Sequence, residues 1–282
     1  IAILPEEMSR ERFEWLERVA GEVIATPGCE SNVKEIFDKT WELRETRDDV
    51  AIFNQFDEFG NYLWHYRVTG GAFEDALNSA LGPRDEVAGL VLTTGSAGTI
   101  ASGDYLKTRF PGMRVAAGEA LQCPTLAENG FGGHRIEGIG DKHVPWIHNV
   151  RNTDAVVTVD DAAVVALARL FNEPAGRKHL VARGVPEGLV SGLGLLGFSG
   201  IANLLMATRF AKHYELGERD VVLTVLTDSM DLYASRLGEM RTELGGYGET
   251  DAAADRARWL LGGCGVELRE LSHVERRRVH NL

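Results

Sequence analysis

The chain has 282 residues, of which 44% are hydrophobic and 26% charged, and its formal net charge is −12 at pH 7. This length can bury a substantial core in one large domain or two smaller ones. The acidic balance argues against a nucleic-acid-binding protein, because such proteins usually present a basic surface.

Three further features limit the class of protein. No apolar run approaches the roughly 20 residues of a membrane span, and acidic and basic residues interrupt any signal-peptide pattern at the N-terminus. Cys29, Cys123 and Cys264 are odd in number and far apart, which argues against a disulfide framework and against a cysteine-rich zinc site. We therefore expect a cytoplasmic protein with no membrane or nucleic-acid partner.

The N-terminal part alternates strand and helix patterns. We expect strands over residues 1–5, 22–25 and 50–53, and helices over residues 9–20, 33–41 and 64–77. Ser9 is of a type that caps a helix, and Glu11 follows it in the first turn. Since the chain begins at Ile1 rather than Met, inside a strand pattern already under way, we expect that residues are missing upstream.

The strongest unit is a buried strand that leads into a glycine-rich turn. The strand AGLVLT (Ala88–Thr93) is a continuous apolar run, typical of a strand buried on both faces. Gly95–Thr99 follows, and then a helix to about Phe110. Small residues let the backbone N–H groups converge, and the helix N-terminus adds partial positive charge, so the turn can bind a phosphate. A tight turn without a ligand is the alternative.

A dinucleotide site is the competing interpretation of this turn. Glu119 ends the next expected strand, roughly where a ribose-binding acid would lie. However, the G-x-G-x-x-G pattern would require glycine where the sequence has Ala97 and Ile100. No Gly-Lys-Ser/Thr follows either, so a compact phosphate site fits better than a P-loop or a pyrophosphate turn.

The rest of the chain keeps the same alternation. We expect strands over residues 114–118, 156–159 and 221–226, an irregular stretch over 129–141, helices over 160–171 and 201–211, a helical excursion over 177–192 and a charged helical extension after 241. Strands that alternate with helices are typical of an α/β protein with a largely parallel sheet.

Five blocks of sequence occur in a fixed order between residues 4 and 237. They are LPEEMSRERFEWL with VIATPG (Leu4–Gly28), FNQF (Phe53–Phe56) with HYRVTG (His65–Gly70), LTTGSAGTIASGDYLK (Leu92–Lys107), RIEGIG (Arg135–Gly140) and LTVLTDSMDLYASRL (Leu223–Leu237). In this order they resemble the blocks of the cysteine synthase and cystathionine β-synthase family. One block alone is a weak signal, but five together are specific.

The resemblance implies the type II pyridoxal-phosphate fold, an α/β fold of two domains that each contain a mostly parallel sheet flanked by helices. A partial small domain would span residues 1–56, a large cofactor-binding domain residues 57–240, and a C-terminal helical extension residues 241–282. The implied cofactor is pyridoxal 5′-phosphate, and the implied assembly is a homodimer.

The resemblance also assigns site residues. The cofactor would contact Gly95, Ser96, Ala97, Gly98, Thr99 and Ser229, and the substrate would contact Gln55, Phe56, Gly138, Gly140 and Asp141. The Asp141-Lys142-His143 trio would select a polar substrate group, unless it is a solvated loop. His143 and His148 suggest no metal site, because no third ligand has a suitable spacing.

Ser229 would face the pyridine nitrogen of the cofactor. A neutral hydroxyl does not keep that nitrogen protonated as a carboxylate would, so the ring would be a weaker electron sink. Such a site suits β-elimination followed by nucleophile addition more than transamination. Asp228 is adjacent, and since neighbouring residues leaving a strand point opposite ways, only one of the two should reach the ring.

The sequence departs from the family pattern in two places. The Schiff-base lysine and the serine/asparagine-rich substrate loop of the family would precede Leu4, and none of the six lysines present lies in a matching context, so no catalytic residue is expected within this chain. In addition, Arg177–Gly192 has no counterpart in the plain family core.

The resemblance implies an enzyme of amino-acid biosynthesis. The expected reaction is pyridoxal-phosphate-dependent β-replacement on an O-activated serine-type amino acid through an aminoacrylate intermediate, as in cysteine synthase. One alternative is a β-eliminating lyase of the cysteine desulfhydrase or serine/threonine dehydratase type. The other, if the chain is complete, is a non-catalytic homologue that binds phosphate or a partner.

Overall fold

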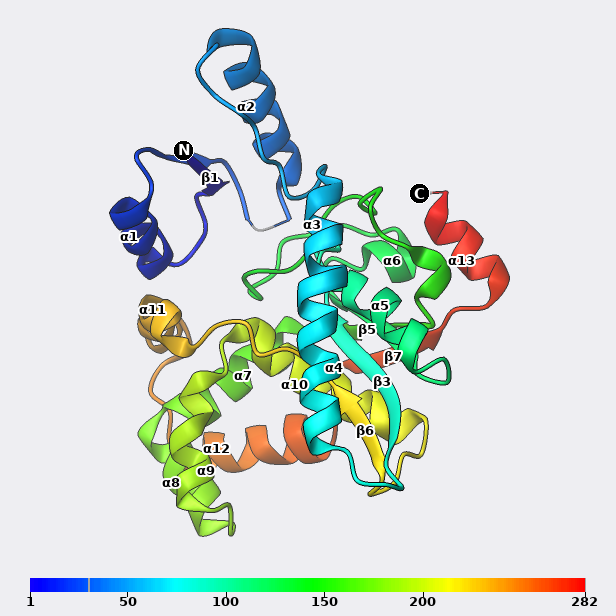
Figure 1. The fold of residues 1–282 in the computed structure, drawn as a ribbon. Helices are drawn as coiled ribbons and strands as arrows, with labels where there is room; N and C mark the ends of the chain where they lie inside the picture. The colour runs from blue at the N-terminus through cyan, green and yellow to red at the C-terminus, as the bar shows by residue number, and fades with distance from the viewer. Residues whose placement is uncertain (30, 282) are drawn as a thin grey trace.

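The N-terminal part of the chain forms a small sheet of its own. In the computed structural model, which describes residues 1–29 and 31–281, strand β1 (Ala2–Pro5) pairs in parallel with β2 (Val23–Thr26). Helices α1 (Arg10–Val19) and α2 (Val33–Thr46) accompany them. Figure 1 shows β1 and α1 in dark blue at the left of the molecule and α2 in a lighter blue above it.

The strand expected over residues 50–53 is wrong. This segment is irregular and pairs with no strand among the described residues, where the small sheet consists of β1 and β2. Its apolar run has a different use, because Val50, Ala51, Ile52 and Phe53 line a cavity. An apolar run of four residues cannot by itself distinguish a paired strand from an extended cavity wall.

The main sheet has five strands in the order β6-β3-β4-β5-β7. They are β3 (Glu86–Thr93), β4 (Arg114–Ala120), β5 (Ala155–Val159), β6 (Asp220–Leu223) and β7 (Val266–Glu270). The first four in sequence run parallel, and β7 runs antiparallel to β5 at the edge. This parallel-rich sheet confirms the expected α/β class.

The segment after residue 241 is therefore not only helical. β7 lies within it and completes the main sheet beside β5. The sequence Val-Glu-Leu-Arg-Glu does alternate apolar and charged residues, which is the pattern of a half-buried strand. The many charged residues of this segment favoured the helical interpretation. Charged side chains are also typical of an edge strand, where they prevent pairing with a further strand.

Helices cover both faces of the main sheet. A long helical rod runs through α3 (Phe59–Trp64), the π-helical turn η1 (His65–Thr69) and α4 (Gly70–Ala80), drawn in cyan in Figure 1. The other helices are α5 (Ala101–Arg109), α6 (Thr125–Glu128), α7 (Asp161–Asn172), α8 (Pro174–Ala182), α9 (Glu187–Gly192), α10 (Phe198–His213), α11 (Ala234–Leu244), α12 (Glu249–Asp255) and α13 (His273–His280), with short turns η2 (Val150–Asn152), η3 (Leu193–Leu195), η4 (Met230–Tyr233) and η5 (Arg256–Leu261).

Two expected helical segments are confirmed by these elements, and the first is the helix over residues 160–171, which is α7. The carboxylate of Asp160 accepts the Ala162 N–H at 3.0 Å and so caps α7. Helices α8 and α9 cover the expected excursion over residues 177–192. Gly70 and Gly71 lie inside the rod without interrupting it.

Alternate side chains of β3 enter the two halves of the core. Val91 packs in the cluster that contains the buried faces of α7 and α10, whereas Leu90 and Leu92 pack in the cluster that contains Leu106 of α5. This division follows from the two-residue repeat of a strand, whose successive side chains point to opposite faces. Burial on both faces explains why the strand reads as a continuous apolar run.

Replacing Leu106 by alanine is expected to cost about 2–5 kcal/mol of unfolding free energy, because the side chain is fully buried at 0% exposure and its loss leaves a cavity in the core. Urea unfolding monitored by circular dichroism measures this cost. Thr108→Ala, an exposed position on the same helix, is the control and should change stability by about 0.5 kcal/mol or less. Equal effects of the two substitutions would contradict the assigned core.

Within the described residues, no single helix is both long and apolar enough to cross a membrane. The segments Glu187–Leu195 and Phe198–His213 reach the required length and composition only together, across a bend of 120°.

Candidate cofactor and substrate site

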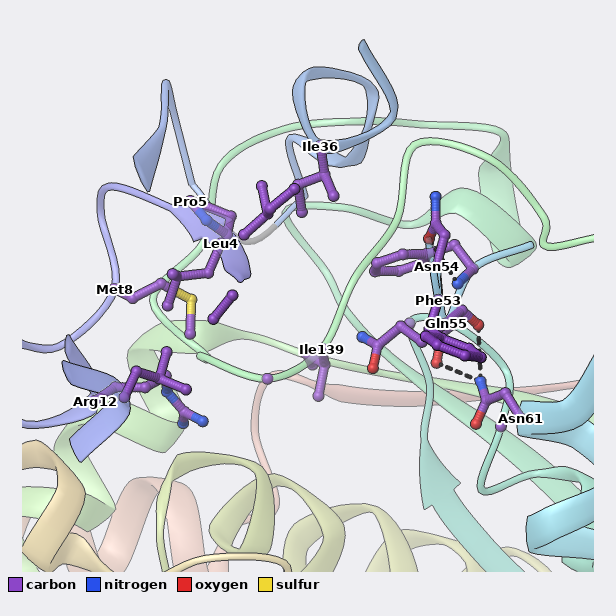
Figure 2. A pocket seen from close by; sticks show the side chains of 18 of the residues that line it. Leu4, Pro5, Met8, Arg12, Ile36, Phe53, Asn54, Gln55, Asn61 and Ile139 are labelled. Carbon is purple, nitrogen blue, oxygen red and sulfur yellow. Dashed lines mark hydrogen bonds between the residues drawn. The ribbon is translucent and has the colours of Figure 1, made fainter. Parts of the chain in front are cut away.

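A cavity of about 1180 Å³ lies between the N-terminal elements and the main sheet. Its wall combines β1 and α1 residues, the segment 50–56, the turn 95–99, the turn 138–140 and residues that follow β6. Figure 2 shows Leu4, Pro5, Met8 and Arg12 on one side of this space and Asn54, Gln55 and Asn61 on another. The crevice beyond the carboxyl ends of parallel strands is the usual ligand site of such sheets.

The turn Gly95–Thr99 has the geometry of an anion site. Ala97 adopts a left-handed backbone with φ of 61°. In the described part of the chain, no N–H group from Gly95 to Thr99 donates a hydrogen bond to a protein acceptor. These donors precede α5, whose N-terminus adds partial positive charge. The turn therefore fits the phosphate group that the family resemblance implies.

Two glycines of this turn lie so close to neighbouring segments that an added side chain would force the neighbours to shift. A Cβ atom at Gly95 would lie 3.1 Å from the Gly140 carbonyl oxygen, and a Cβ atom at Gly98 would lie 2.3 Å from Asn61 Oδ1. The turn is thus packed against two other parts of the cavity wall, which explains the need for glycine at both positions.

Asn61, which the sequence reasoning missed, joins the turn to the substrate segment. Its amide Nδ2 donates to the Gln55 carbonyl at 2.8 Å and to Ser96 Oγ at 3.2 Å, as Figure 2 shows for the first of these bonds. Asn61 lies between the FNQF and HYRVTG blocks. An isolated asparagine in a helix carries no pattern of its own, so only its place between two matched blocks could have marked it.

Asn203 is a second residue that the sequence did not reveal. It lies on α10 with 1% of its surface exposed. Its Oδ1 accepts the Thr93 N–H at 2.7 Å, and its Nδ2 donates to the Val225 carbonyl at 2.8 Å. One buried amide therefore holds the end of β3 against the segment that follows β6, and it fixes the origin of the phosphate turn.

The predicted substrate residues Gln55, Phe56, Gly138 and Gly140 line the same cavity as the phosphate turn. Gly138 and Gly140 have φ of 89° and 97°, a backbone region that favours glycine. The Gly140 N–H donates to the Thr94 carbonyl at 3.0 Å, which joins the two turns directly. A substrate beside residues 138–140 would therefore also lie beside residues 95–99.

Ser229 is not among the residues that line the cavity, whereas Thr227 and Asp228 are. The chain turns into η4 at this point, and Ser229 Oγ accepts the Asp231 N–H at 3.3 Å as the cap of that turn. Thr227 instead brings a hydroxyl to the cavity, where its Oγ1 lies 2.7 Å from Ser199 Oγ. The contact of Ser229 with the pyridine nitrogen stays a prediction.

Asp141 lies behind the turn and not in the main cavity. It borders a small space of about 10 Å³ together with Glu119 and His148. Burial raises the pKa of the Asp141 carboxyl to about 6. The hydrogen bond from the His143 N–H favours the charged form and so acts in the opposite direction. Lys142 Nζ lies 4.4 Å from the centre of the Phe131 ring, and the side chain of His143 is 72% exposed with its Nδ1 3.8 Å from Asp141 Oδ1.

Glu119 does not contact the main cavity either. Its two carboxylate oxygens accept the N–H groups of Leu126 and Ala127 at 2.8 Å each, at the start of α6. Burial raises the pKa of this carboxyl to about 7, although both N–H groups act in the opposite direction. A carboxylate used in this way cannot bind a ribose, so the geometry disfavours a dinucleotide site.

No lysine of the described residues lines the cavity. Lys107, for example, donates to the Asn152 carbonyl at 2.7 Å and to Asp154 at 2.5 Å. Among the described residues, the turn suited to a phosphate and the predicted substrate turn therefore have no lysine beside them in the cavity.

Comparison with known proteins gives a consistent set of relatives, although no family model matches the sequence. Cysteine synthase B of Campylobacter jejuni is 28% identical over 236 residues, which cover 83% of this chain and 70% of that protein. The structure of an O-acetylserine-dependent cystathionine β-synthase from Helicobacter pylori is 25% identical and matches with a TM-score of 0.66 over 83% of this chain and 68% of that one.

A hydrogen sulfide-producing enzyme from Fusobacterium nucleatum has a similar fold. It is 24% identical and matches with a TM-score of 0.68 over 96% of this chain and 71% of that one. The match thus extends over nearly the whole chain, so the fold is one that a solved structure shares.

Proposed function

Because this chain belongs to the family of pyridoxal 5′-phosphate-dependent enzymes that includes cysteine synthase and cystathionine β-synthase, we propose that it catalyses β-replacement on an O-activated serine. The observation that supports this proposal best is the direct bond between the Gly140 N–H and the Thr94 carbonyl, 3.0 Å long. It joins the turn to which we assign the cofactor phosphate to the turn to which we assign the amino acid.

The bound cofactor supplies a ring that withdraws electrons from the α-carbon of an amino acid. In our proposal the residues Gly95, Ser96, Ala97, Gly98 and Thr99 hold its phosphate through backbone N–H groups and hydroxyls. Asn61 and Asn203 keep that turn in place. Ser229 is the proposed partner of the pyridine nitrogen, as the family resemblance implies.

The substrate amino acid would lie between Gln55 and the turn Gly138–Gly140. Gln55 would donate to its carboxylate, Phe56 would cover it, and the missing side chains of Gly138 and Gly140 would leave room for it. Asp141 would act on the substrate only from behind this turn. The proposed domains are residues 1–56 and 57–240 with an extension over 241–282, and the proposed assembly is a homodimer.

The absorption spectrum of the protein expressed from its full coding sequence tests the proposal. A visible cofactor band that shifts when O-acetylserine is added, with cysteine formed once sulfide is supplied, is the expected result. Pyruvate formed without any added nucleophile would mean that the enzyme catalyses β-elimination and not β-replacement. A colourless protein that ignores both pyridoxal phosphate and O-acetylserine would overturn the assignment as an enzyme.

A further inference from the structure

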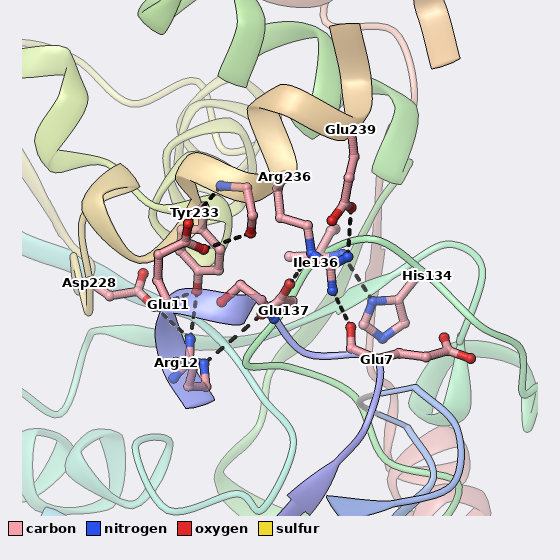
Figure 3. Close-up of polar contacts among 12 residues, drawn as sticks. Glu7, Glu11, Arg12, His134, Ile136, Glu137, Asp228, Tyr233, Arg236 and Glu239 are labelled. Atoms are coloured by element: carbon pink, nitrogen blue, oxygen red, sulfur yellow. Dashed lines mark hydrogen bonds and ion pairs between the residues drawn. The ribbon is translucent and has the colours of Figure 1, made fainter. Parts of the chain in front are cut away.

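Three distant segments of the chain converge on the carboxylate of Glu137, which immediately precedes the substrate turn. Glu137 is 4% exposed. Its Oε2 accepts the Ser9 N–H at 3.0 Å, and its Oε1 accepts Arg236 Nε at 2.6 Å. A buried carboxylate is costly unless it is paired and hydrogen-bonded. Figure 3 shows Glu137 between α1 and α11, with the side chains of Arg12 and Arg236 beside it.

Arg12 provides the second cation and extends the cluster to the cavity. Its Nε lies 4.0 Å from Glu137 Oε2, and its Nη2 donates to Tyr233 at 2.8 Å and to Asp228 at 3.2 Å. Arg12 and Asp228 both line the cavity. One side chain of α1 therefore connects the residue before the substrate turn with the residues that follow β6.

Arg236 connects the same carboxylate to the N-terminal segment. Its Nη2 donates to the Glu7 carbonyl, and its Nη1 contacts Glu239 at 2.8 Å on the outer side. A parallel connection lies next to it, where Glu11 accepts the N–H and the hydroxyl of Ser235 at 2.8 and 2.6 Å. The N-terminal elements are thus attached to α11 through charged groups that meet at Glu137.

The position of Glu137 in the sequence gives this cluster a functional consequence. The next three residues are Gly138, Ile139 and Gly140, and both glycines have positive φ. Glycine loses more conformational freedom on ordering than any other residue, so such a turn depends on fixed ends. The hydrogen bond from Gly140 to Thr94 fixes one end, and the Glu137 carboxylate holds the other against α1 and α11.

We propose that Glu137 is a positioning residue: it sets the geometry of the substrate turn by tying it to the N-terminal helix and to α11. The inference rests on the proposed function only in taking Gly138–Gly140 as the place where the amino acid binds. Loss of the carboxylate charge would loosen the turn and weaken substrate binding, while groups that act on bound substrate would be unaffected.

A matched pair of variants separates this role from a general loss of charge. Glu137→Gln and Glu239→Gln each remove one carboxylate partner of Arg236, but only Glu137 also contacts Ser9 and adjoins the turn. Glu239 is 58% exposed and serves as the control. Arg236→Lys is the milder variant, because it keeps the positive charge and loses the Nε–H that Glu137 accepts.

Hydrogen exchange of the backbone amides gives the first measurement, and it needs neither cofactor nor activity. Glu137→Gln should speed exchange at Ser9 and at Gly138–Gly140 by about tenfold or more, Arg236→Lys should do so less, and Glu239→Gln should leave both segments unchanged. Equal exchange in Glu137→Gln and Glu239→Gln would overturn the inference. If Glu137→Gln fails to fold, Arg236→Lys against Glu239→Gln makes the same comparison with the same two outcomes.

The kinetic measurement uses O-acetylserine and sulfide. Glu137→Gln should raise the KM for O-acetylserine about tenfold and change kcat less than about threefold, and restoring the glutamate should reverse both. A roughly tenfold fall in kcat with an unchanged KM for O-acetylserine would overturn the positioning role. A protein that lacks any cofactor band, yet shows the expected exchange pattern, would refute the proposed function and leave the role of Glu137 in the turn supported.

Discussion

Gly98→Ala is expected to weaken pyridoxal phosphate binding about thirtyfold while the protein stays folded. The added Cβ would lie 2.3 Å from Asn61 Oδ1, so the asparagine side chain must move. Its amide then loses the bonds to the Gln55 carbonyl and to Ser96, at about 1 kcal/mol each. Two such losses correspond to roughly thirtyfold in a dissociation constant.

Fluorescence titration of the protein with pyridoxal phosphate measures this effect. The control is Gly71→Ala in the helical rod, where nothing lies within 4 Å of the added atom, and it should leave the dissociation constant unchanged. Thermal unfolding of both variants checks that the fold persists. Binding by Gly98→Ala within about threefold of the unsubstituted protein would show that Asn61 does not support the phosphate turn.

Glu119→Gln is expected to change how stability depends on pH by about 3 kcal/mol. Burial raises the pKa of Glu119 from 4.5 in the unfolded chain to about 7 in the folded protein. As pH rises from 4.5 towards 7, the unfolded state therefore loses its proton first. Folding stability falls over this range, at about 1.4 kcal/mol for each pH unit of separation between the two pKa values.

Urea unfolding at pH 4, 5, 6, 7 and 8 tests this expectation. The stability of the unsubstituted protein relative to Glu119→Gln should fall by about 3 kcal/mol between the ends of the range, because glutamine does not titrate. Glu267→Gln, at an exposed position of β7, is the control for the loss of one carboxylate. A pH-independent difference between Glu119→Gln and the unsubstituted protein would mean that the pKa of Glu119 is the same in the folded and unfolded states.

The sequence predicts the fold best where burial determines the residue pattern. The apolar run of β3, the small residues of the phosphate turn and the face of α10 all follow from packing on two sides, and each is visible as a local pattern. These elements also carry the blocks that resemble the family. Sequence reasoning was therefore sufficient for the class of fold and for the position of the phosphate turn.

The features that the sequence did not predict depend on contacts between segments that are distant in the sequence. Asn61 and Asn203 act through bonds to segments 6–110 residues away, which no short pattern encodes. Val50–Phe53 has the composition of a strand, but the described residues offer no neighbour for it to pair with. The role of Ser229 beside the pyridine nitrogen stays a prediction, and the capping bond that its hydroxyl makes at η4 is a contact that the sequence pattern does not indicate.

The placement of β7 links the assembly of the sheet to the order of protein synthesis. All five residues of β5 are buried, and β7 covers the free edge of that strand although its sequence begins more than a hundred residues later, at Val266. Until β7 emerges from the ribosome, β5 presents unpaired N–H and C=O groups, which is the condition that promotes pairing between chains. The nascent protein therefore carries this unpaired edge while more than a hundred further residues are translated, until β7 closes it.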